Sequence, residues 1–359
     1  MRILQIIQKK QLRGAEVFTA QLSAHMVNAG HEVLIVSLGD GDALLPFTGD
    51  IHVLHANFKK KFFDWGAWKR LATVIKEFNP DIVQANAGDT LKYAVISKTI
   101  FRWKQPVIFR NASMVSSYIH GKITKMITAW LFANVSHIIS VSAFTKNDLV
   151  QYFGLDSTGI TVLPVGIELQ PFSTLEKFEK GLINLVHVGG FSFEKNHERM
   201  LVMFRKLWES DNRFRLWLIG DGPLRERIRK QAAELGVEEY VYFEGFNKNP
   251  LNYISSANML LLPSKIEGLP AVILEAFYCK VPVVAYNAGG ISELVINEKT
   301  GWLINVDDEA GFISAVQQIT VMEKTRLQPV VENAYHKVIS GYTNKHIAES
   351  FIDVYKKQL

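Results

Sequence analysis

Short apolar runs alternate along the chain with longer segments whose apolar residues recur at a helical period. The runs lie at residues 2–7, 31–38, 81–86, 106–111, 137–142 and 160–165 in the first half, and at 183–190, 214–222, 241–246, 259–264 and 281–286 in the second. Runs without regular polar alternation are typical of parallel strands that helices cover on both faces. The pattern predicts an α/β protein with two Rossmann-like, doubly wound parallel sheets.

The length of the chain favours two domains. It has 359 residues, and a single hydrophobic core stops growing at roughly 250–300 residues. We predict an N-terminal domain at 1–165, a linker at 166–181, a C-terminal domain at 182–340, and a C-terminal helix at 341–359 that packs back towards the N-terminal domain. The carboxyl ends of the strands in the two sheets should face a central cleft, and ligands of such sheets bind beyond these ends.

Composition narrows the class of protein. Hydrophobic residues make up 48% and charged residues 21% of the chain, and Cys279 is its one cysteine. These values are typical of a folded protein without a disulfide framework, which suits a reducing compartment. We also expect no signal peptide and no transmembrane helix. The net charge of +5 is compatible with nucleic acid, an anionic membrane surface or phosphorylated small molecules.

Four loops that follow strands of the second half carry the candidate chemistry. They lie at 189–200, 220–228, 264–277 and 288–295, and all contain glycine. Glycine lets the backbone approach a ligand closely, and three of these loops run directly into a helix, whose N-terminus favours anions. The loops therefore predict a ligand that carries phosphate.

Two glutamates stand eight positions apart in the third of these loops. Pro270 marks a helix start, so Glu267 is expected in the loop, and Glu275 roughly 7–8 Å deeper along the helix axis. A carboxylate in an apolar helix is costly unless it is satisfied, and a pair of ligand hydroxyls would satisfy it. The spacing alone leaves equally open that Glu275 faces solvent or caps a neighbouring backbone.

The sequence from 264 to 304 resembles the donor-site signature of retaining GT-B glycosyltransferases of family 4, the glycosyl transferases group 1, with its pattern of glutamate, seven residues, glutamate. The resemblance continues, in the same order, at residues 13–37, 137–149, 187–196 and 218–246. It therefore covers nearly the whole chain. Each loop alone would be a weak signal, whereas the combination is specific.

The resemblance implies a hexosyltransferase-type enzyme that moves a sugar from a UDP- or GDP-linked donor to a hydroxyl of a glycan or a lipid-linked acceptor, in surface polysaccharide or glycolipid synthesis. The acceptor would attack from the face that the diphosphate leaves. No cofactor, no metal and no nucleic acid is expected. The expected location is the cytoplasm, with peripheral association at the inner face of the membrane.

The resemblance also implies roles for single residues. Glu267 and Lys195 would be catalytic, Glu267 by contacting the transferred sugar and Lys195 by neutralising the donor phosphates. Glu275 would accept hydrogen bonds from the donor ribose. The other expected donor contacts are the backbone of Gly268, Leu269 and Pro270, Gly14 of the first domain, and Phe246 near the base.

Two positions depart from the family pattern. Gly190 stands where relatives have an arginine, so one phosphate cation is missing. Arg110 and Asn111 stand where a histidine is common, and we treat both as candidate phosphate or acceptor contacts. We hypothesise that Arg13, beside Gly14, reaches across the cleft and replaces the cation missing at Gly190. An exposed Arg13 on a flexible loop is the alternative.

Other functions remain open at this stage. The departures make a non-catalytic sugar-nucleotide-binding subunit conceivable, and a sugar-nucleotide epimerase shares the two-domain fold. A nicotinamide dehydrogenase is disfavoured because Arg225 occupies the third glycine position of its fingerprint. Basic and aromatic residues interleave at 58–70 and 120–130, which is typical either of a surface that meets anionic lipid or of a solvated charged face. His137 and His187 are expected in the core.

Overall fold

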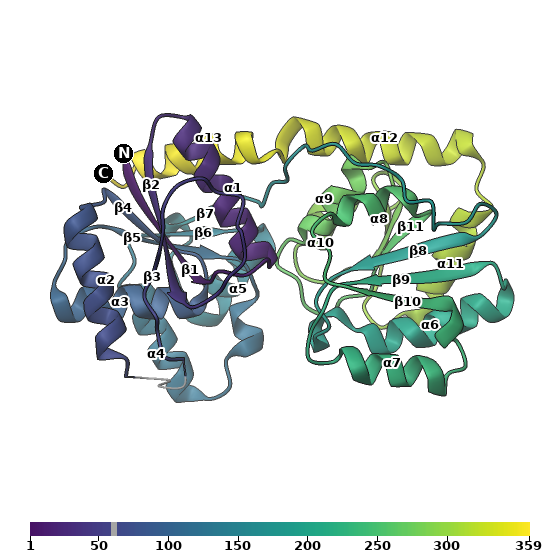
Figure 1. Ribbon diagram of the computed structural model, residues 1–359, viewed down its shortest axis with the longest axis horizontal. Helices are drawn as coiled ribbons and strands as arrows, with labels where there is room; N and C mark the ends of the chain where they lie inside the picture. The colour runs from purple at the N-terminus through teal and green to yellow at the C-terminus, as the bar shows by residue number, and fades with distance from the viewer. Residues whose placement is uncertain (59–62) are drawn as a thin grey trace. The chain divides into compact units, whose positions relative to one another are not determined.

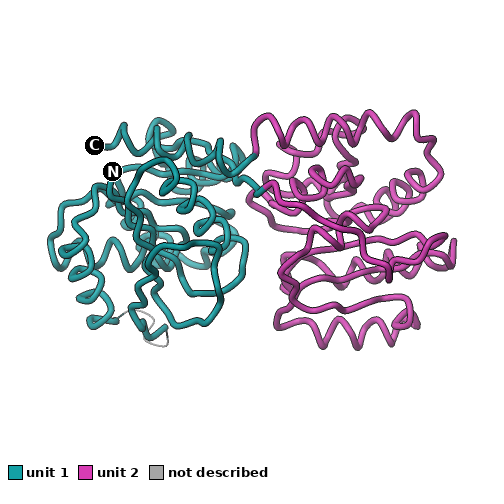
Figure 2. The backbone as a smooth tube through the Cα atoms, turned by 45° about the horizontal axis from the view of Figure 1, so that its top comes forward, with its two compact units in different colours: residues 1–168, 343–359 teal, residues 169–342 magenta. Residues whose placement is uncertain are grey.

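The computed structural model describes residues 1–58 and 63–359. It separates into two compact units (Figure 2). Unit 1 contains residues 1–168 and 343–359, and unit 2 contains residues 169–342. The chain therefore passes from one unit to the other twice, after Glu168 and after Tyr342.

Unit 1 is built on a seven-stranded parallel sheet with the strand order β3-β2-β1-β4-β5-β6-β7. The order reverses between β1 and β4, which is the switch point of a doubly wound sheet. The strands are β1 (Arg2–Lys9), β2 (Glu32–Gly39), β3 (Ile51–Val53), β4 (Ile82–Ala85), β5 (Val107–Asn111), β6 (His137–Ser140) and β7 (Ile160–Val162).

Helices cover both faces of this sheet (Figure 1). On one face the main core of unit 1 forms between the strands and α2 (Trp65–Phe78), α3 (Gly88–Phe101), α4 (Lys122–Ala133) and α5 (Ala143–Phe153). On the other face lie α1 (Gly14–Asn28) and the C-terminal helix α13 (Asn344–Lys356), which pack against each other. Short 3-10 helices lie at Val115–Tyr118 and Ser157–Gly159.

Unit 2 has a six-stranded parallel sheet with the order β10-β9-β8-β11-β12-β13, so its switch point lies between β8 and β11. The strands are β8 (Ile183–Val188), β9 (Phe214–Ile219), β10 (Val241–Gly245), β11 (Met259–Leu262), β12 (Val283–Tyr286) and β13 (Trp302–Ile304).

The helices of unit 2 again form two layers (Figure 1). One layer contains α6 (His197–Ser210), α7 (Arg225–Glu234) and α11 (Glu309–Thr320), whose apolar side chains form the core with the strands. The other contains α8 (Pro250–Ser256), α9 (Ala271–Tyr278) and α12 (Lys324–Gly341). The four-residue helix α10 (Ile291–Leu294) and 3-10 turns at Phe193–Lys195 and Glu238–Tyr240 complete the unit.

The prediction of two doubly wound parallel sheets is confirmed, and two strands were missed. Strands β3 and β13 have three residues each, and most of these are only partly buried. Neither forms the longer apolar run that identifies a buried strand in a sequence.

The segment predicted as a linker, 166–181, divides between the units. The boundary falls between Glu168 and Leu169. Beyond it the backbone is tied to unit 2, because the Ser173 amide donates to Asn252 Oδ1 at 3.0 Å and the ring of Phe178 stacks on Trp217 with 4.3 Å between centroids. A segment without a regular period can still be held in place by such contacts.

Candidate functional site

Two oppositely charged side chains meet at the switch point of unit 2. Lys195 ends the 3-10 turn that follows β8, and Glu267 lies in the loop that follows the neighbouring strand β11. Lys195 Nζ donates to Glu267 Oε1 at 2.6 Å. Glu267 is buried, whereas the Lys195 side chain keeps 23% of its surface exposed. The fold thus brings together the two residues that the resemblance implies to be catalytic.

Glycines hold the backbone of these loops. Gly289 has φ +59°, and a Cβ atom there would lie 1.8 Å from the carbonyl oxygen of Glu267. Gly220 has φ +145°, and its Cβ would lie 2.0 Å from the Gly189 carbonyl oxygen. A side chain at either position would meet backbone that cannot move aside cheaply, so the glycines fix the distances between neighbouring loops.

Hydrogen bonds between backbones join the same loops. The amide of Lys265 donates to the carbonyl of Glu194 at 2.7 Å, and the amide of Gly290 donates to the carbonyl of Gly268 at 3.0 Å. The loops after β8, β11 and β12 are therefore linked to one another, which holds Lys195 and Glu267 in register.

Glu275 is the fifth residue of α9, a helix that begins at Ala271 after Pro270. Burial raises the pKa of its carboxyl to about 7. No side chain in the described part of the chain donates a hydrogen bond to this carboxyl. A carboxyl in this state is compatible with a group that binds the hydroxyls of a ligand. Hydrogen bonds from such hydroxyls would favour the charged form of the carboxyl.

The remaining predicted donor contacts of unit 2 differ in exposure. Gly268, Leu269 and Pro270 are buried between Glu267 and α9. Phe246 follows β10 and exposes 50% of its surface. Gly190 has space around it, since its Cβ would meet only the Asp221 carbonyl oxygen at 3.5 Å.

Two buried histidines support the turn that carries Lys195. His187, which was predicted to be a core residue, donates from Nδ1 to the Leu261 carbonyl at 2.9 Å and so connects β8 with β11. The ring of His197 stacks on Phe191, with 4.2 Å between centroids. Burial lowers the pKa of His187 to about 4 and that of His197 to about 2, so both are neutral at physiological pH. Sequence reasoning did not single out His197.

His137 is only half-buried, and its Nε2 lies 2.8 Å from Thr161 Oγ1.

In unit 1 the predicted site residues lie at the carboxyl ends of β1 and β5. Gly14 is the first residue of α1, and no atom would lie within 4 Å of a Cβ there. Arg13 precedes it and is exposed. Two residues into the helix, Glu16 is buried and accepts a hydrogen bond from Gln11 at 2.9 Å, and burial raises the pKa of its carboxyl.

Arg110 and Asn111 have internal partners. Arg110 is 1% exposed, and it donates from Nε to Asn86 Oδ1 at 3.0 Å and from Nη2 to the Ala15 carbonyl at 3.3 Å. Burial lowers the pKa of Arg110 to about 10. Asn111, on the opposite face of β5, donates to the Thr145 carbonyl at 3.4 Å. Both side chains help to hold unit 1 together, and their role towards phosphate or acceptor stays a prediction.

Arg110 belongs to a buried polar network that sequence reasoning missed. Asn86 Nδ2 and Gln84 Nε2 donate to Gln5 Oε1 at 2.9 and 3.0 Å, and Tyr355 Oη donates to Gln84 Oε1 at 2.6 Å. Gln5 and Gln84 are register partners in β1 and β4. The signal available in the sequence was an amide side chain inside each of two apolar runs, Gln5 in 2–7 and Gln84 in 81–86. For Tyr355, which is 271 positions from Gln84, there was none.

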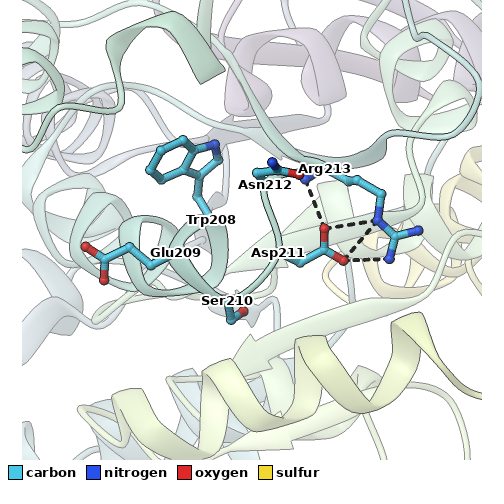
Figure 3. A pocket seen from close by; sticks show the side chains of 6 residues that line it. All are labelled: Trp208, Glu209, Ser210, Asp211, Asn212 and Arg213. Carbon is cyan, nitrogen blue, oxygen red and sulfur yellow. Dashed lines mark hydrogen bonds and ion pairs between the residues drawn. The ribbon is translucent and has the colours of Figure 1, made fainter.

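A surface depression of unit 2 lies outside this site. It has a volume of about 630 Å³ and is formed by Trp208–Arg213, between the end of α6 and the start of β9 (Figure 3). Asp211 and Arg213 pair across it at 2.6 Å. It therefore lies at the amino end of β9, whereas Lys195 and Glu267 lie beyond the carboxyl ends of the strands. Among residues 1–58 and 63–359 no cluster of His, Cys, Asp and Glu has a metal-binding arrangement.

Comparison with known families now identifies the class. Residues 173–337 match the family model of the glycosyl transferases group 1, and residues 12–171 match that of glycosyltransferase family 4. Together with the two parallel α/β units, these matches define a glycosyltransferase with the GT-B fold. The chain belongs to family 4, whose members are retaining enzymes.

Known relatives are distant. The chain is 27% identical over 207 residues to the putative colanic acid biosynthesis glycosyltransferase WcaL of Escherichia coli, a match that covers 55% of this chain and 51% of the relative. It is 26% identical over 214 residues to N-acetylgalactosamine-N,N'-diacetylbacillosaminyl-diphospho-undecaprenol 4-alpha-N-acetylgalactosaminyltransferase of Campylobacter jejuni, covering 59% of this chain and 57% of that protein. The matched region thus spans little more than half the length of these two relatives.

A solved structure confirms the fold over the full length. Anabaena Alr3699/HepE, in complex with UDP and glucose, superposes with a TM-score of 0.85 at 19% identity, and the match covers 99% of this chain and 100% of that one. None of the helices in residues 1–58 and 63–359 combines the length and apolar character needed to cross a bilayer.

Proposed function

We propose that this glycosyltransferase moves a sugar from a nucleoside-diphosphate sugar, UDP- or GDP-linked, to a hydroxyl of a glycan or a lipid-linked acceptor. The product would enter a surface polysaccharide or glycolipid. We further propose that the enzyme works on the cytoplasmic side, at the inner face of the membrane.

One observation carries the donor assignment. The ammonium of Lys195 and the carboxylate of Glu267 lie 2.6 Å apart at the switch point between β8 and β11, which is where doubly wound sheets bind nucleotides. A cation there would meet the donor diphosphate, and the adjacent acceptor oxygens would meet sugar hydroxyls. The donor would lie across the loops after β8 and β11.

Glu275 would bind the ribose. Its carboxyl lies within α9, a turn beyond the loop that holds Glu267, so the two acids would contact different parts of one donor. Two ribose hydroxyls donating to Glu275 would lower the pKa that burial has raised to about 7. Donor binding would then be coupled to loss of a proton near neutral pH.

The chemistry would depend on electrostatics. As the bond between the sugar and the diphosphate breaks, charge develops on the departing phosphate, and Lys195 would stabilise it. The acceptor hydroxyl would attack from the same face and give its proton to the diphosphate. Glu267 would orient the sugar hydroxyls.

The functions of these relatives support the acceptor class. One acts in colanic acid biosynthesis and another on a diphospho-undecaprenol-linked sugar. The solved relative is in complex with UDP and glucose, which favours UDP over GDP among the two donors.

A thermal-shift panel of sugar nucleotides, followed by a transfer assay on glycan and lipid-linked acceptors, tests this function. A donor at 100 times its Kd adds about 2.7 kcal/mol to the free energy of unfolding, so the correct donor should raise Tm clearly. Lys195→Ala should abolish that shift. The matched control is Lys299→Ala, which removes an exposed lysine of unit 2 outside the loops after β8 and β11.

The alternatives predict different results. A chain that binds a donor but neither transfers nor hydrolyses it would be a non-catalytic subunit, and one that releases an isomerised sugar nucleotide without acceptor would be an epimerase. If no sugar nucleotide shifts Tm, or if Lys195→Ala and Lys299→Ala behave alike, the proposed donor site is wrong.

A further inference from the structure

Helix α4 exposes an apolar stripe on the surface of unit 1. Ile123, Met126, Ile127 and Trp130 expose 76%, 70%, 40% and 43% of their surface. Their spacing of i, i+3, i+4 and i+7 places them on one face of the helix. Tyr118, just before α4, is 44% exposed.

The packing of α4 does not require this stripe. The helix is anchored by Leu131 and Phe132 in its last turn, which are buried in the core. The ring of Phe132 packs against those of Phe109 and Phe153, with centroids 5.6 and 5.0 Å apart. Figure 1 draws α4 at the lower edge of unit 1. The stripe is therefore an additional apolar surface on a helix that is already fixed.

The sequence around α4 lacks acidic residues. From Thr90 to Asn147 the sequence contains no Asp or Glu, whereas it contains eight cationic residues, namely Lys92, Lys98, Arg102, Lys104, Arg110, Lys122, Lys125 and Lys146. The formal charge of this segment exceeds the +5 of the whole chain. Lys122 is exposed at the side of the stripe, and Lys125 is exposed on the other face of α4, where its Nζ lies 4.2 Å from the centroid of the Tyr152 ring.

We propose that α4 is the surface by which this protein binds an anionic lipid bilayer, with Ile123, Met126, Ile127 and Trp130 entering the headgroup boundary. A helix with an exposed apolar face and neighbouring lysines has the character of an interfacial helix. Each lysine near an anionic membrane contributes about a fivefold increase in affinity. A second copy of the chain fits less well, because α4 carries two exposed lysines and no acidic residue, so a twofold contact through this helix would bring like charges together.

The position of α4 gives the contact a use. The helix begins eleven residues after β5 ends at Asn111, so it follows from the carboxyl edge of the sheet of unit 1. An acceptor carried by a lipid would thus be presented beside the edge that also holds Gly14. This last step rests on the proposed function, whereas binding of α4 to lipid does not.

The second stretch with basic and aromatic residues, 58–70, is not part of the proposed surface. Residues 59–62 lie outside the described part of the chain. The Phe63 and Trp65 rings, which are 69% and 48% exposed, contact Trp68 and Phe101 at 5.6 and 5.3 Å between centroids. These rings pack on neighbouring helices of unit 1.

Vesicle flotation of the full chain tests the proposal. Vesicles of phosphatidylcholine alone are compared with vesicles that contain phosphatidylglycerol, at low and at high salt. We expect binding only to the anionic vesicles, weakened by salt. Ile123→Ser with Met126→Ser should reduce binding at least tenfold, and Lys122→Gln with Lys125→Gln should reduce it at least tenfold and remove most of its salt dependence.

The controls are surface changes elsewhere that match in type. Leu44→Ser with Val321→Ser removes two apolar side chains that are 85% and 83% exposed, and Lys299→Gln with Lys324→Gln removes two exposed lysines of unit 2. Both should bind vesicles as the unchanged protein does. The thermal shift caused by the sugar nucleotide, measured on each variant, shows that the fold and the donor site are intact.

Three results would overturn the proposal: binding to neutral and anionic vesicles alike, α4 variants that bind as well as their controls, or a chain that ignores vesicles and dimerises through α4 in light scattering. Because vesicle binding is read without turnover, its failure would leave the proposed reaction untouched. A chain that binds vesicles but transfers no sugar would support the membrane surface and contradict the proposed reaction.

Discussion

The two sheets share one topology and hold their carboxyl edges in different ways. In unit 2 the loops after neighbouring strands are locked together by glycines and backbone hydrogen bonds, and they bring Lys195 and Glu267 to 2.6 Å. In unit 1 Gly41 ties the loop after β2 to Lys10, since its Cβ would lie 2.1 Å from the Lys10 carbonyl oxygen, whereas the loop at Gly14 is open and rests on a buried network that runs from Arg110 to Tyr355. The candidate donor site therefore depends on backbone geometry, whereas the open loop at Gly14 is held by side-chain contacts.

The largest effect is expected from Gly289→Ala. The new Cβ would lie 1.8 Å from the Glu267 carbonyl oxygen at a φ of +59°. The strain and the displaced loop should lower the free energy of unfolding by about 3–4 kcal/mol. Urea unfolding measures this. Gly14→Ala is the matched change in unit 1, where a Cβ has free space, and it should shift stability by less than about 0.5 kcal/mol. Equal effects at both glycines would remove the contrast between the units.

Glu275→Gln should have opposite effects on stability and on binding. The pKa of the folded acid, about 7, lies above its ordinary value of 4.5, so the folded chain binds the extra proton and stability falls as pH rises between these values. At pH 8 the substitution should therefore stabilise the chain by about 2–3 kcal/mol, and at pH 5 by little. Urea unfolding at both pH values checks this.

The same substitution should weaken the binding of the nucleoside diphosphate by roughly ten- to 150-fold in calorimetry, because it removes the charge from hydrogen bonds to the ribose. Unchanged affinity would contradict the ribose assignment, even if the stability change is found.

Tyr355→Phe tests the network of unit 1. The change removes the donor to Gln84 Oε1 and leaves a buried acceptor unsatisfied, which should lower the free energy of unfolding by about 1–3 kcal/mol. Sugar-nucleotide affinity should not change, since Lys195, Glu267 and Glu275 belong to unit 2. Tyr335→Phe, on α12, serves as the control and should be near neutral. A loss of donor affinity in Tyr355→Phe would show that the two edges are coupled.

The smallest effect is expected in the cycle of Arg13 and Gly190. If Arg13 supplies the phosphate cation that Gly190 lacks, Arg13→Ala should lower turnover about tenfold, or about 1.4 kcal/mol. Gly190→Arg, which the space around Gly190 accommodates, should restore part of the loss. Kinetics of the four proteins should then show non-additivity. Strict additivity would mean that the phosphate charge is balanced by other groups.

Local patterns made the fold and much of the donor site predictable. The long apolar runs predicted eleven of the strands, and they failed only for β3 and β13. Strand β7 also has three residues, but it begins a longer apolar run at 160–165, which β3 and β13 lack. Lys195 and Glu267 were singled out by the family resemblance, and the structure adds that the loops which carry them follow adjoining strands.

Contacts between remote residues could not be predicted in the same way. Gln5 and Gln84 interrupt their apolar runs. An amide side chain in a strand does not indicate which residue it binds unless its partner is near in the sequence. Their partner Tyr355 lies in the last helix. The burial of Arg110 follows from the same network, so the sequence position that suggested a ligand contact could not reveal that its side chain is engaged inside unit 1.

Completion of unit 1 by α13 has a consequence for biosynthesis. Residues 1–168 are synthesised before unit 2, and Gln84 in this part has its hydrogen-bond partner Tyr355 in α13. Unit 2 is continuous from Leu169 to Tyr342, so all of its strands and helices have been synthesised before α13 exists. Domains tend to fold as units during synthesis. Unit 1, whose synthesis begins first, is therefore completed after unit 2. A chain that stops before Tyr355 would contain all of unit 2 together with an incomplete unit 1.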